Sequence, residues 1–210
     1  MKEYFGKYHG SVQAEWMLEG RKMRLLKDFK FEDPNHMLWV SPKNSEVDGA
    51  SIPPAFWSII GSPFSGKYRD ASVIHDVACQ QKKRTWEVVH LAFYYAMRAS
   101  GVSIIQAKIM YAAVYHFGPR WPRIEMVDSE EAIDDIKYDR IKSIGTDTSD
   151  TAYFPDAIKY DFKRKSKRTS QVSKNIPPDN YSIKKSDFER LQKTIKENSQ
   201  FDLDQIRSFK

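Results

Sequence analysis

A histidine and an aspartate stand side by side in an otherwise apolar stretch of the sequence, as His75 and Asp76. Ala71, Ile74 and Ala78 around them follow helical spacing, which predicts a buried helix. A buried polar group without a hydrogen-bond partner costs about 1–3 kcal/mol, so other segments have to supply partners. The sequence therefore predicts a polar site centred on His75 and Asp76.

Two further segments carry side chains that can meet this pair. The first is the turn Asp48-Gly49-Ala50-Ser51-Ile52-Pro53, which offers a carboxylate and a hydroxyl, and the second is a later helix that carries His90. Arg69 and Trp57 are the basic and aromatic residues that we expect to line the substrate pocket. We expect these segments to converge on one site, because functional groups are commonly gathered from several elements.

Metal binding is the first chemistry that fits these residues. His75, His90 and a carboxylate from Asp76 or Asp48 offer two nitrogen ligands and one oxygen ligand. Zinc is the usual ion for two imidazoles and a carboxylate, with water in the open position. Water bound to such an ion hydrolyses amides or esters. The predicted metal ligands are His75, Asp76 and His90.

General-base catalysis is the second chemistry. Here Asp48 orients His75, which takes a proton from water or from Ser51. The predicted catalytic residues are His75, Asp76, Asp48 and Ser51. The His-Asp pair on a helix resembles that of the secreted phospholipases A2, and this likeness implies calcium as the alternative ion.

A purely structural interpretation fits the same residues. Asp48 and Ser51 are types favoured in turns and helix caps for backbone reasons alone. His75 and His90 are equally consistent with core histidines that bond to backbone carbonyls or to each other. The sequence leaves the catalytic and the structural interpretations open.

The elements that position these residues are predicted to form an α+β fold. A small antiparallel β-meander comes first and packs on a layer of three to four helices. The predicted strands span residues 11–17, 22–31 and 36–41. The predicted helices span residues 51–61, 68–81, 85–100 and 104–117.

The chain of 210 residues is predicted to hold one domain, residues 1–124, and a charged extension, residues 125–210. The extension is largely irregular, with a short helix near residues 187–198. The net charge is +6, and one dense basic cluster spans Lys163 to Arg168. Such a run is more often a solvated linker than a nucleic-acid footprint. We expect the extension to wrap the domain, to bind a protein partner or to be partly disordered, with nucleic-acid binding as the less favoured alternative.

The number of cysteines and the N-terminal sequence predict the cellular compartment of the protein. The lone Cys79 excludes an internal disulfide and a cysteine-rich zinc module. The first ten residues have no apolar region of the signal-peptide type, and no stretch is long enough for a membrane span. We therefore expect a cytoplasmic protein.

Five stretches form a recognisable pattern when they are taken in order. They are residues 23–29, Asp48–Pro53 with Trp57, Gly66–Arg69, His75-Asp76, and Met110–Val114 with Phe117-Gly118. In order and spacing they resemble the phage and bacterial domain-of-unknown-function family 1353, over roughly residues 10–122. One departure is His90, because the family has Ala-Asp where this chain has Val89-His90. The resemblance implies a phage, prophage or bacterial source and carries no established activity.

Two functions from different classes follow from these observations. The first is a hydrolase of phage or bacterial origin with a His/Asp-centred, metal-dependent site for amides or esters, acting on a small or polymeric substrate such as cell-wall material. The second is a non-enzymatic phage or prophage accessory, or an inhibitor of a host protein, that binds its partner through residues 125–210. The first places the protein in the bacterial cytoplasm, and the second also allows association with the virion.

Overall fold

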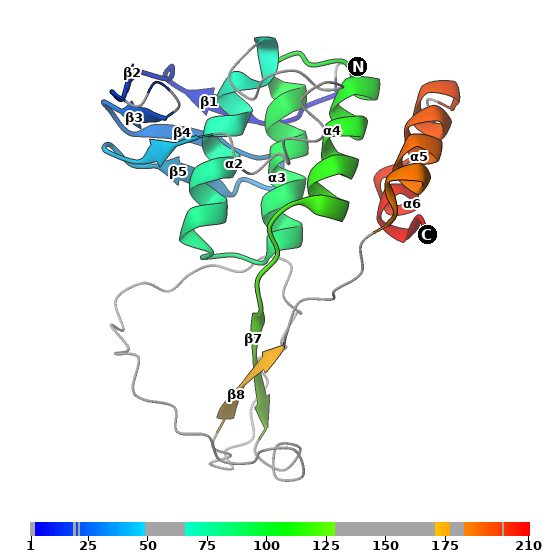
Figure 1. The fold of residues 1–210 in the computed structure, drawn as a ribbon. Coiled ribbons are helices and arrows are strands. Elements are labelled where there is room, and N and C mark those ends of the chain that lie inside the picture. The colour runs from blue at the N-terminus through cyan, green and yellow to red at the C-terminus, as the bar shows by residue number, and fades with distance from the viewer. Residues whose placement is uncertain are drawn as a thin grey trace. The chain divides into compact units, whose positions relative to one another are not determined.

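The computed structural model of this chain describes seven stretches of residues (Figure 1). They are residues 3–18, 20, 22–48, 66–128, 171–176, 183–198 and 200–210. The chain divides into two compact units. The larger unit comprises residues 1–122 and 177–210, and the smaller comprises residues 123–176.

Two antiparallel sheets, each of three strands, begin the larger unit. The first has the order β1-β4-β5, formed by β1 (Lys7–His9), β4 (Phe29–Glu32) and β5 (Leu38–Ser41). The second has the order β2-β3-β6, formed by β2 (Ala14–Trp16), β3 (Met23–Leu25) and β6 (Glu46–Val47). In β4, Phe29 and Phe31 are buried while the alternate residues are not, as the strand period of two requires. The predicted α+β fold class is confirmed.

The strand predicted over residues 22–31 is in fact two strands, β3 and β4, in different sheets. The chain bends after Leu25, and the side chain of Leu26 is exposed. Hydrogen bonds from the segment before β6 hold the bend: Lys43 N donates to Asp28 Oδ1 at 2.9 Å, and Asn44 N donates to Leu25 O at 2.8 Å. The break between β3 and β4 therefore depends on hydrogen-bond partners some fifteen residues away in the sequence. The hydrophobic alternation within residues 22–31 cannot reveal such partners.

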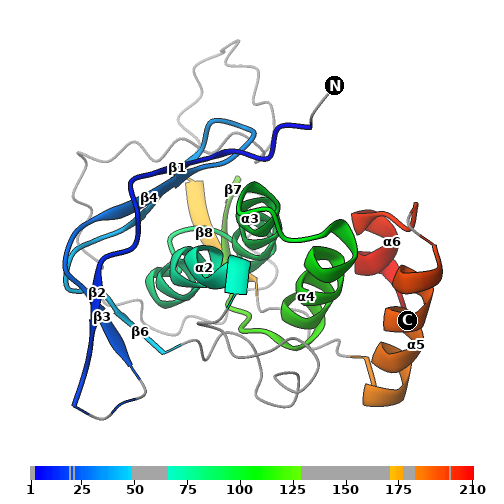
Figure 2. The same ribbon diagram turned by 90° about the horizontal axis from the view of Figure 1, so that it is seen from above.

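A layer of helices covers the buried faces of the sheets (Figure 2). A short 3-10 helix, η2 (Gly66–Tyr68), leads into α2 (Arg69–Gln81), and α3 (Trp86–Ala99) and α4 (Ile104–Phe117) follow. Consecutive helices pack on each other, α2 on α3 and α3 on α4. These bounds lie close to the predicted ones, and the helix predicted over residues 51–61 lies outside the described residues.

Two C-terminal helices pack on α4 within the larger unit. They are α5 (Lys185–Glu197) and α6 (Leu203–Ser208). The apolar side chains that they bury are Phe188, Leu191, Ile195 and Ile206. Arg207 Nε also donates to the hydroxyl of Tyr111 on α4 at 2.7 Å. The structure therefore groups these two helices with residues 1–122 in the larger unit, where α5 packs its apolar side chains against α4.

The smaller unit is described only by one antiparallel pair of strands. In it, β7 (Arg123–Asp128) pairs with β8 (Gln171–Ile176), so that Arg123 lies opposite Ile176. The basic cluster from Lys163 to Arg168 lies outside the described residues. Among the described helices, none is both long enough and apolar enough to cross a membrane.

Candidate functional site

Three buried side chains bring polar atoms together between α2 and α3. His75 and Cys79 are four residues apart on α2 and therefore share one face of that helix, and His90 lies on α3. His75 Nε2 lies 2.8 Å from His90 Nδ1 and 3.6 Å from Cys79 Sγ. All three donor atoms lie within 4.8 Å of one another. We call these three residues the buried cluster.

The hydrogen bonds of the buried cluster determine where its protons lie. His90 Nε2 is 3.1 Å from the carbonyl oxygen of Pro119, which can only accept, so Nε2 carries a proton. In a neutral imidazole the other nitrogen, Nδ1, is then an acceptor. His75 Nε2 therefore donates to His90 Nδ1, and a chain of donors runs from His75 through His90 to the backbone.

Both imidazoles are held in the neutral form. Burial lowers the pKa of His75 well below its usual value, and the neighbouring His90 lowers it further. Burial also lowers the pKa of His90 to about 3, although the hydrogen bond to Pro119 acts in the opposite direction. Neutral imidazole is the form that binds metal ions, so neither histidine has to convert from the cationic to the neutral form before it binds one.

Aromatic rings enclose the buried cluster. Phe93 stacks on the ring of His75 with a centroid separation of 4.6 Å, and Trp86 lies 5.6 Å from the ring of His90. None of the three cluster side chains is more than 6% exposed. The site is therefore sealed from solvent, and any reaction there requires a conformational change that admits water or substrate.

The donor set suits zinc or a similar transition metal. Tetrahedral zinc with Zn–N near 2.0 Å and Zn–S near 2.3 Å places its ligand atoms about 3.3 to 3.5 Å apart. The separation of 3.6 Å between Cys79 Sγ and His75 Nε2 already fits, and the 2.8 Å between the imidazoles needs to open by about half an ångström. His90 Nε2, the nitrogen that would face away from the ion, bonds to the carbonyl oxygen of Pro119. Metal-bound histidines usually donate their second N–H to a group of this kind.

The structure brings together two of the three predicted metal ligands, His75 and His90, and adds Cys79 to them. Asp76 is buried on α2, but its carboxylate is not part of this group. Neighbouring residues on a helix point about 100° apart, which separates Asp76 from the face that carries His75. The four-residue spacing of His75 and Cys79 was visible in the sequence and is the signal that could have identified the third member.

Of the other predicted site residues, the structure describes Asp48 and Arg69, and neither belongs to the buried cluster. Asp48 is half-buried just after β6 and is not part of the group of donor atoms. Arg69 begins α2 and lies 3.5 Å from the carboxylate of Asp70, largely exposed. Ser51 and Trp57 lie outside the described residues.

A cavity of about 230 Å³ lies beside α2 but is not lined by the buried cluster. Its walls include Trp39 on β5, Ile74 and Ala78 on α2, and Arg84 in the loop that follows. The guanidinium of Arg84 lies over the ring of Trp39, 4.9 Å from its centroid. Since His75 and Cys79 follow directly after Ile74 and Ala78, the cavity and the buried cluster occupy adjacent faces of one helix.

Comparison with known families confirms the resemblance expected from the sequence. Residues 23–114 match the model of a family described as a protein of unknown function (DUF1353). The matched region contains β3 to β6 and the helices α2 and α3, and therefore all three residues of the buried cluster. The C-terminal helices α5 and α6 lie outside it.

Two curated relatives come from Sinorhizobium fredii. The uncharacterized protein y4jT is 48% identical over 121 residues, which is 57% of this chain and 36% of the relative. The uncharacterized protein y4iH is 46% identical over 99 residues, which is 47% of this chain and 41% of the relative. The chain thus spans well under half the length of these relatives. No solved structure matches it.

Proposed function

We propose that this protein binds a divalent transition metal, zinc by its donor set, through His75, Cys79 and His90, and that the bound ion serves a hydrolytic reaction. One observation carries the proposal: two neutral imidazoles and a thiol converge to within 4.8 Å, with the outer nitrogen of one imidazole anchored on a backbone carbonyl. Both features are common at metal centres: a group of nitrogen and sulfur donors that can bind the ion directly, and a hydrogen bond that fixes the other nitrogen of a ligating histidine.

Binding of the metal requires a defined rearrangement of protons. His75 gives up the proton on Nε2 and carries one on Nδ1 instead, so its charge is unchanged. His90 already presents a free lone pair on Nδ1. Cys79 loses its thiol proton, because the thiolate is the form that binds metals. One proton per metal ion is therefore released to solvent near neutral pH.

The hydrolytic part of the proposal depends on the number of protein donors. Three donors leave a fourth position for water, which is the arrangement of catalytic rather than structural zinc sites. An ion in this position supplies an activated water for attack on an amide or ester carbonyl, of which cell-wall material is the phage-relevant example. Because the donors are at most 6% exposed, we expect turnover to depend on opening of the site.

The test is spectroscopic and does not require a known substrate. Metal-free protein is titrated with Co²⁺, whose thiolate charge-transfer absorption in the near ultraviolet reports a bond to sulfur. We expect this band in the parent protein, its loss in Cys79→Ser, and greatly weakened binding in His90→Gln. His116→Gln is the matched control, because His116 is a buried histidine that bonds to the carbonyl of Ile206 instead. Absence of the band from the parent protein would overturn the proposal.

A second function is favoured by a different feature of the same residues. The imidazoles already bond to each other and to the backbone, and they are sealed from solvent, as in a network that serves stability alone. The protein would then be a non-enzymatic phage or prophage accessory, or a host inhibitor, in the cytoplasm or on the virion, with residues 125–210 in contact with a protein partner. Purified protein that binds no metal, yet loses stability in His90→Gln, would favour this alternative.

A further inference from the structure

The cavity beside α2 combines apolar walls with positive charge. Its volume is about 230 Å³, and residues of β5, α2 and α3 line it together with the loop between the two helices. Leu38 and Val40 on β5 belong to its wall, although their side chains are 46% and 36% exposed. The charged residues in the wall are Lys83 and Arg84, and none of the described residues that line the cavity is acidic. The cavity therefore favours a ligand that is both apolar and negatively charged.

Arg84 is the cationic group best placed to bind such a ligand. Its half-buried guanidinium lies over the ring of Trp39, 4.9 Å from the centroid. A guanidinium in this position keeps its N–H groups at the rim of its own plane, where they can meet an anion. Within the part of the chain that the structure describes, no hydrogen bond or ion pair engages these N–H groups, although the charge of Asp33 acts on them from a distance. Arg84 thus retains its capacity for a carboxylate.

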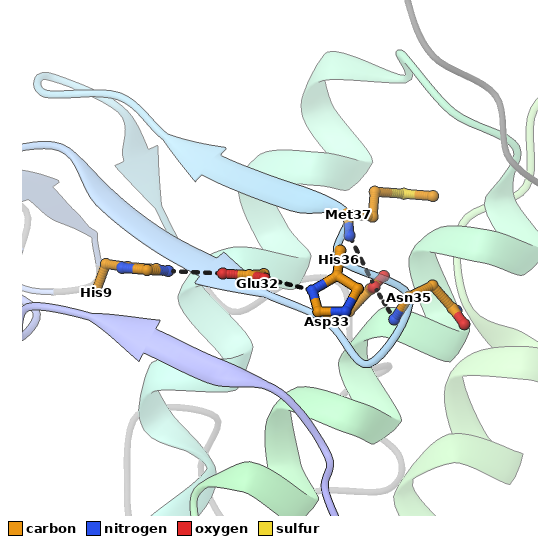
Figure 3. Close-up of polar contacts among 6 residues, drawn as sticks. All are labelled: His9, Glu32, Asp33, Asn35, His36 and Met37. Carbon is orange, nitrogen blue, oxygen red and sulfur yellow. Dashed lines mark hydrogen bonds and ion pairs between the residues drawn. The ribbon is translucent and has the colours of Figure 1, made fainter.

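The ring beneath Arg84 is held in a fixed orientation by Asp33 (Figure 3). The indole N–H of Trp39 donates to Asp33 Oδ2 at 3.0 Å. Asp33 Oδ1 in turn accepts from the backbone N–H groups of Asn35 at 2.8 Å and Met37 at 3.1 Å. Both oxygens of the buried Asp33 are therefore engaged with the turn and the indole, and the platform for Arg84 is formed before any ligand binds.

The main chain of Arg84 is also fixed. The indole N–H of Trp121 donates to the carbonyl oxygen of Arg84 at 2.7 Å. Arg84 is therefore held at two points, its backbone by Trp121 and its side chain by Trp39. Such preorganisation reduces the entropy that a ligand loses on binding, and it distinguishes Arg84 from an arginine that extends freely into water.

We propose that this cavity binds a small carboxylate ligand with an apolar or aromatic body, with the carboxylate on Arg84 and the body against the walls formed by α2, α3 and β5. The planar fork of arginine matches the two oxygens of a carboxylate. Cavities that hold drug-sized ligands usually measure about 300–1,000 Å³, so this smaller one suits a compact molecule. Lys83 adds positive charge but is exposed, and its contribution is therefore weaker.

The cavity lies close to the buried cluster but is separate from it. Three of its wall residues, Ile74, Ala78 and Val89, each directly precede a member of the buried cluster in the sequence. A ligand in the cavity therefore packs against the same turns of α2 and α3 that carry the proposed metal ligands. The carboxylate site itself requires no metal, so this inference does not depend on the proposed function.

The test is a titration of purified protein with benzoate, followed by ¹H–¹⁵N correlation NMR without added metal. We expect the amide signals of Val40 and Ala78, on opposite walls of the cavity, to shift with a dissociation constant on the order of 1 mM, as is usual for a ligand of so few atoms. Benzamide has nearly the same shape without the charge and should bind roughly tenfold or more weakly. Equal binding of the two, or no shift at either amide, would overturn the proposal.

Variants of Arg84 locate the charge that is responsible. Arg84→Gln should lower the affinity for benzoate roughly tenfold or more, and Arg84→Lys should lower it less, because the charge remains while the fork is lost. Arg69→Gln is the matched control and should change nothing, since Arg69 is an exposed arginine at the start of α2 that does not line the cavity. Unchanged affinity in Arg84→Gln, or tighter binding of phenyl phosphate than of benzoate, would contradict the assignment. Should Arg84→Gln fail to fold, the comparison of benzoate with benzamide on the parent protein still decides the question.

Discussion

The buried cluster and a solvent-exposed group on the first sheet use the same kind of side chain in opposite environments. The exposed group, which we call the exposed cluster, consists of His9 at the end of β1, Glu32 at the end of β4 and His36 in the turn that follows (Figure 3). Between α2 and α3, burial excludes charge, and each histidine bonds to a neutral partner, His75 to His90 and His90 to a carbonyl. On the sheet, solvent permits charge, and His9 and His36 both bond to the carboxylate of Glu32. The environment, rather than the residue type, thus determines the partner and the protonation state.

This difference has consequences for both stability and metal exchange. Groups in the buried cluster cannot be solvated when a partner is lost, so each removal is costly. Groups in the exposed cluster can turn to water, and ion pairs of that kind contribute little to stability. A metal held by the buried cluster should exchange slowly, because the site must open.

Removal of a buried histidine is expected to give the largest effect. His75→Ala leaves His90 Nδ1 without its donor and creates a cavity beside Phe93, so the free energy of unfolding should fall by about 3 kcal/mol or more. Urea denaturation of metal-free protein measures this loss. His9→Ala is the matched substitution in the exposed cluster and should leave stability unchanged within error. Equal losses in the two variants would contradict the comparison.

Acid should destabilise the protein through the buried cluster. In the unfolded chain these histidines take up protons below about pH 6.5, but in the folded chain the pKa of His90 is about 3 and that of His75 is also lowered. Stability is therefore complete above pH 6.5 and is lost as the pH falls toward 3, by about 1.4 kcal/mol per pH unit from His90, and the lowered pKa of His75 adds to the loss.

Denaturation curves at a series of pH values measure this slope. His90→Gln cannot titrate at that position, so its slope should be smaller by about one proton, while His9→Gln should keep most of the parent slope. A parent stability that stays constant from pH 7 to pH 5 would show that the buried histidines are not held neutral.

Replacement of the thiol is expected to give the smallest of these effects. Cys79→Ser exchanges a weakly polar buried group for a hydroxyl, at a cost of about 1–2 kcal/mol, and leaves the bond between the imidazoles in place. Thermal or urea unfolding of the metal-free proteins measures the stability of Cys79→Ser relative to the parent protein. If Cys79→Ser destabilised the chain as much as His75→Ala, the imidazole pair would not be the main polar contact of the site.

Local patterns in the sequence predicted much of the helical layer. The helix predicted over residues 104–117 is α4, and the hydroxyl of Ser103 caps it by accepting from the backbone N–H of Gln106 at 3.3 Å. The bounds of α2, α3 and α4 follow from apolar periodicity and from end signals that lie within the helices themselves. These features are local, and for that reason a single sequence contains them.

Features that depend on distant partners were less accessible. The bend after Leu25 relies on Lys43 and Asn44, and the docking of α5 relies on a surface of α4 that only the folded chain presents. The sequence marked His75 and His90 as a pair, but not Cys79 as their neighbour, because a single cysteine was interpreted only as evidence against a disulfide and against a cysteine-rich zinc module. The exposed cluster was missed because it joins the ends of two strands and a turn, and the pairing of β1 with β4 is not a local feature of the sequence.

The most direct test of the metal site is X-ray absorption at the zinc edge, recorded on the parent protein loaded with one equivalent of Zn²⁺. We expect one sulfur at about 2.3 Å and two imidazole nitrogens at about 2.0 Å, with one lighter ligand completing the shell. A shell of nitrogen and oxygen alone would show that Cys79, His75 and His90 do not hold the metal together.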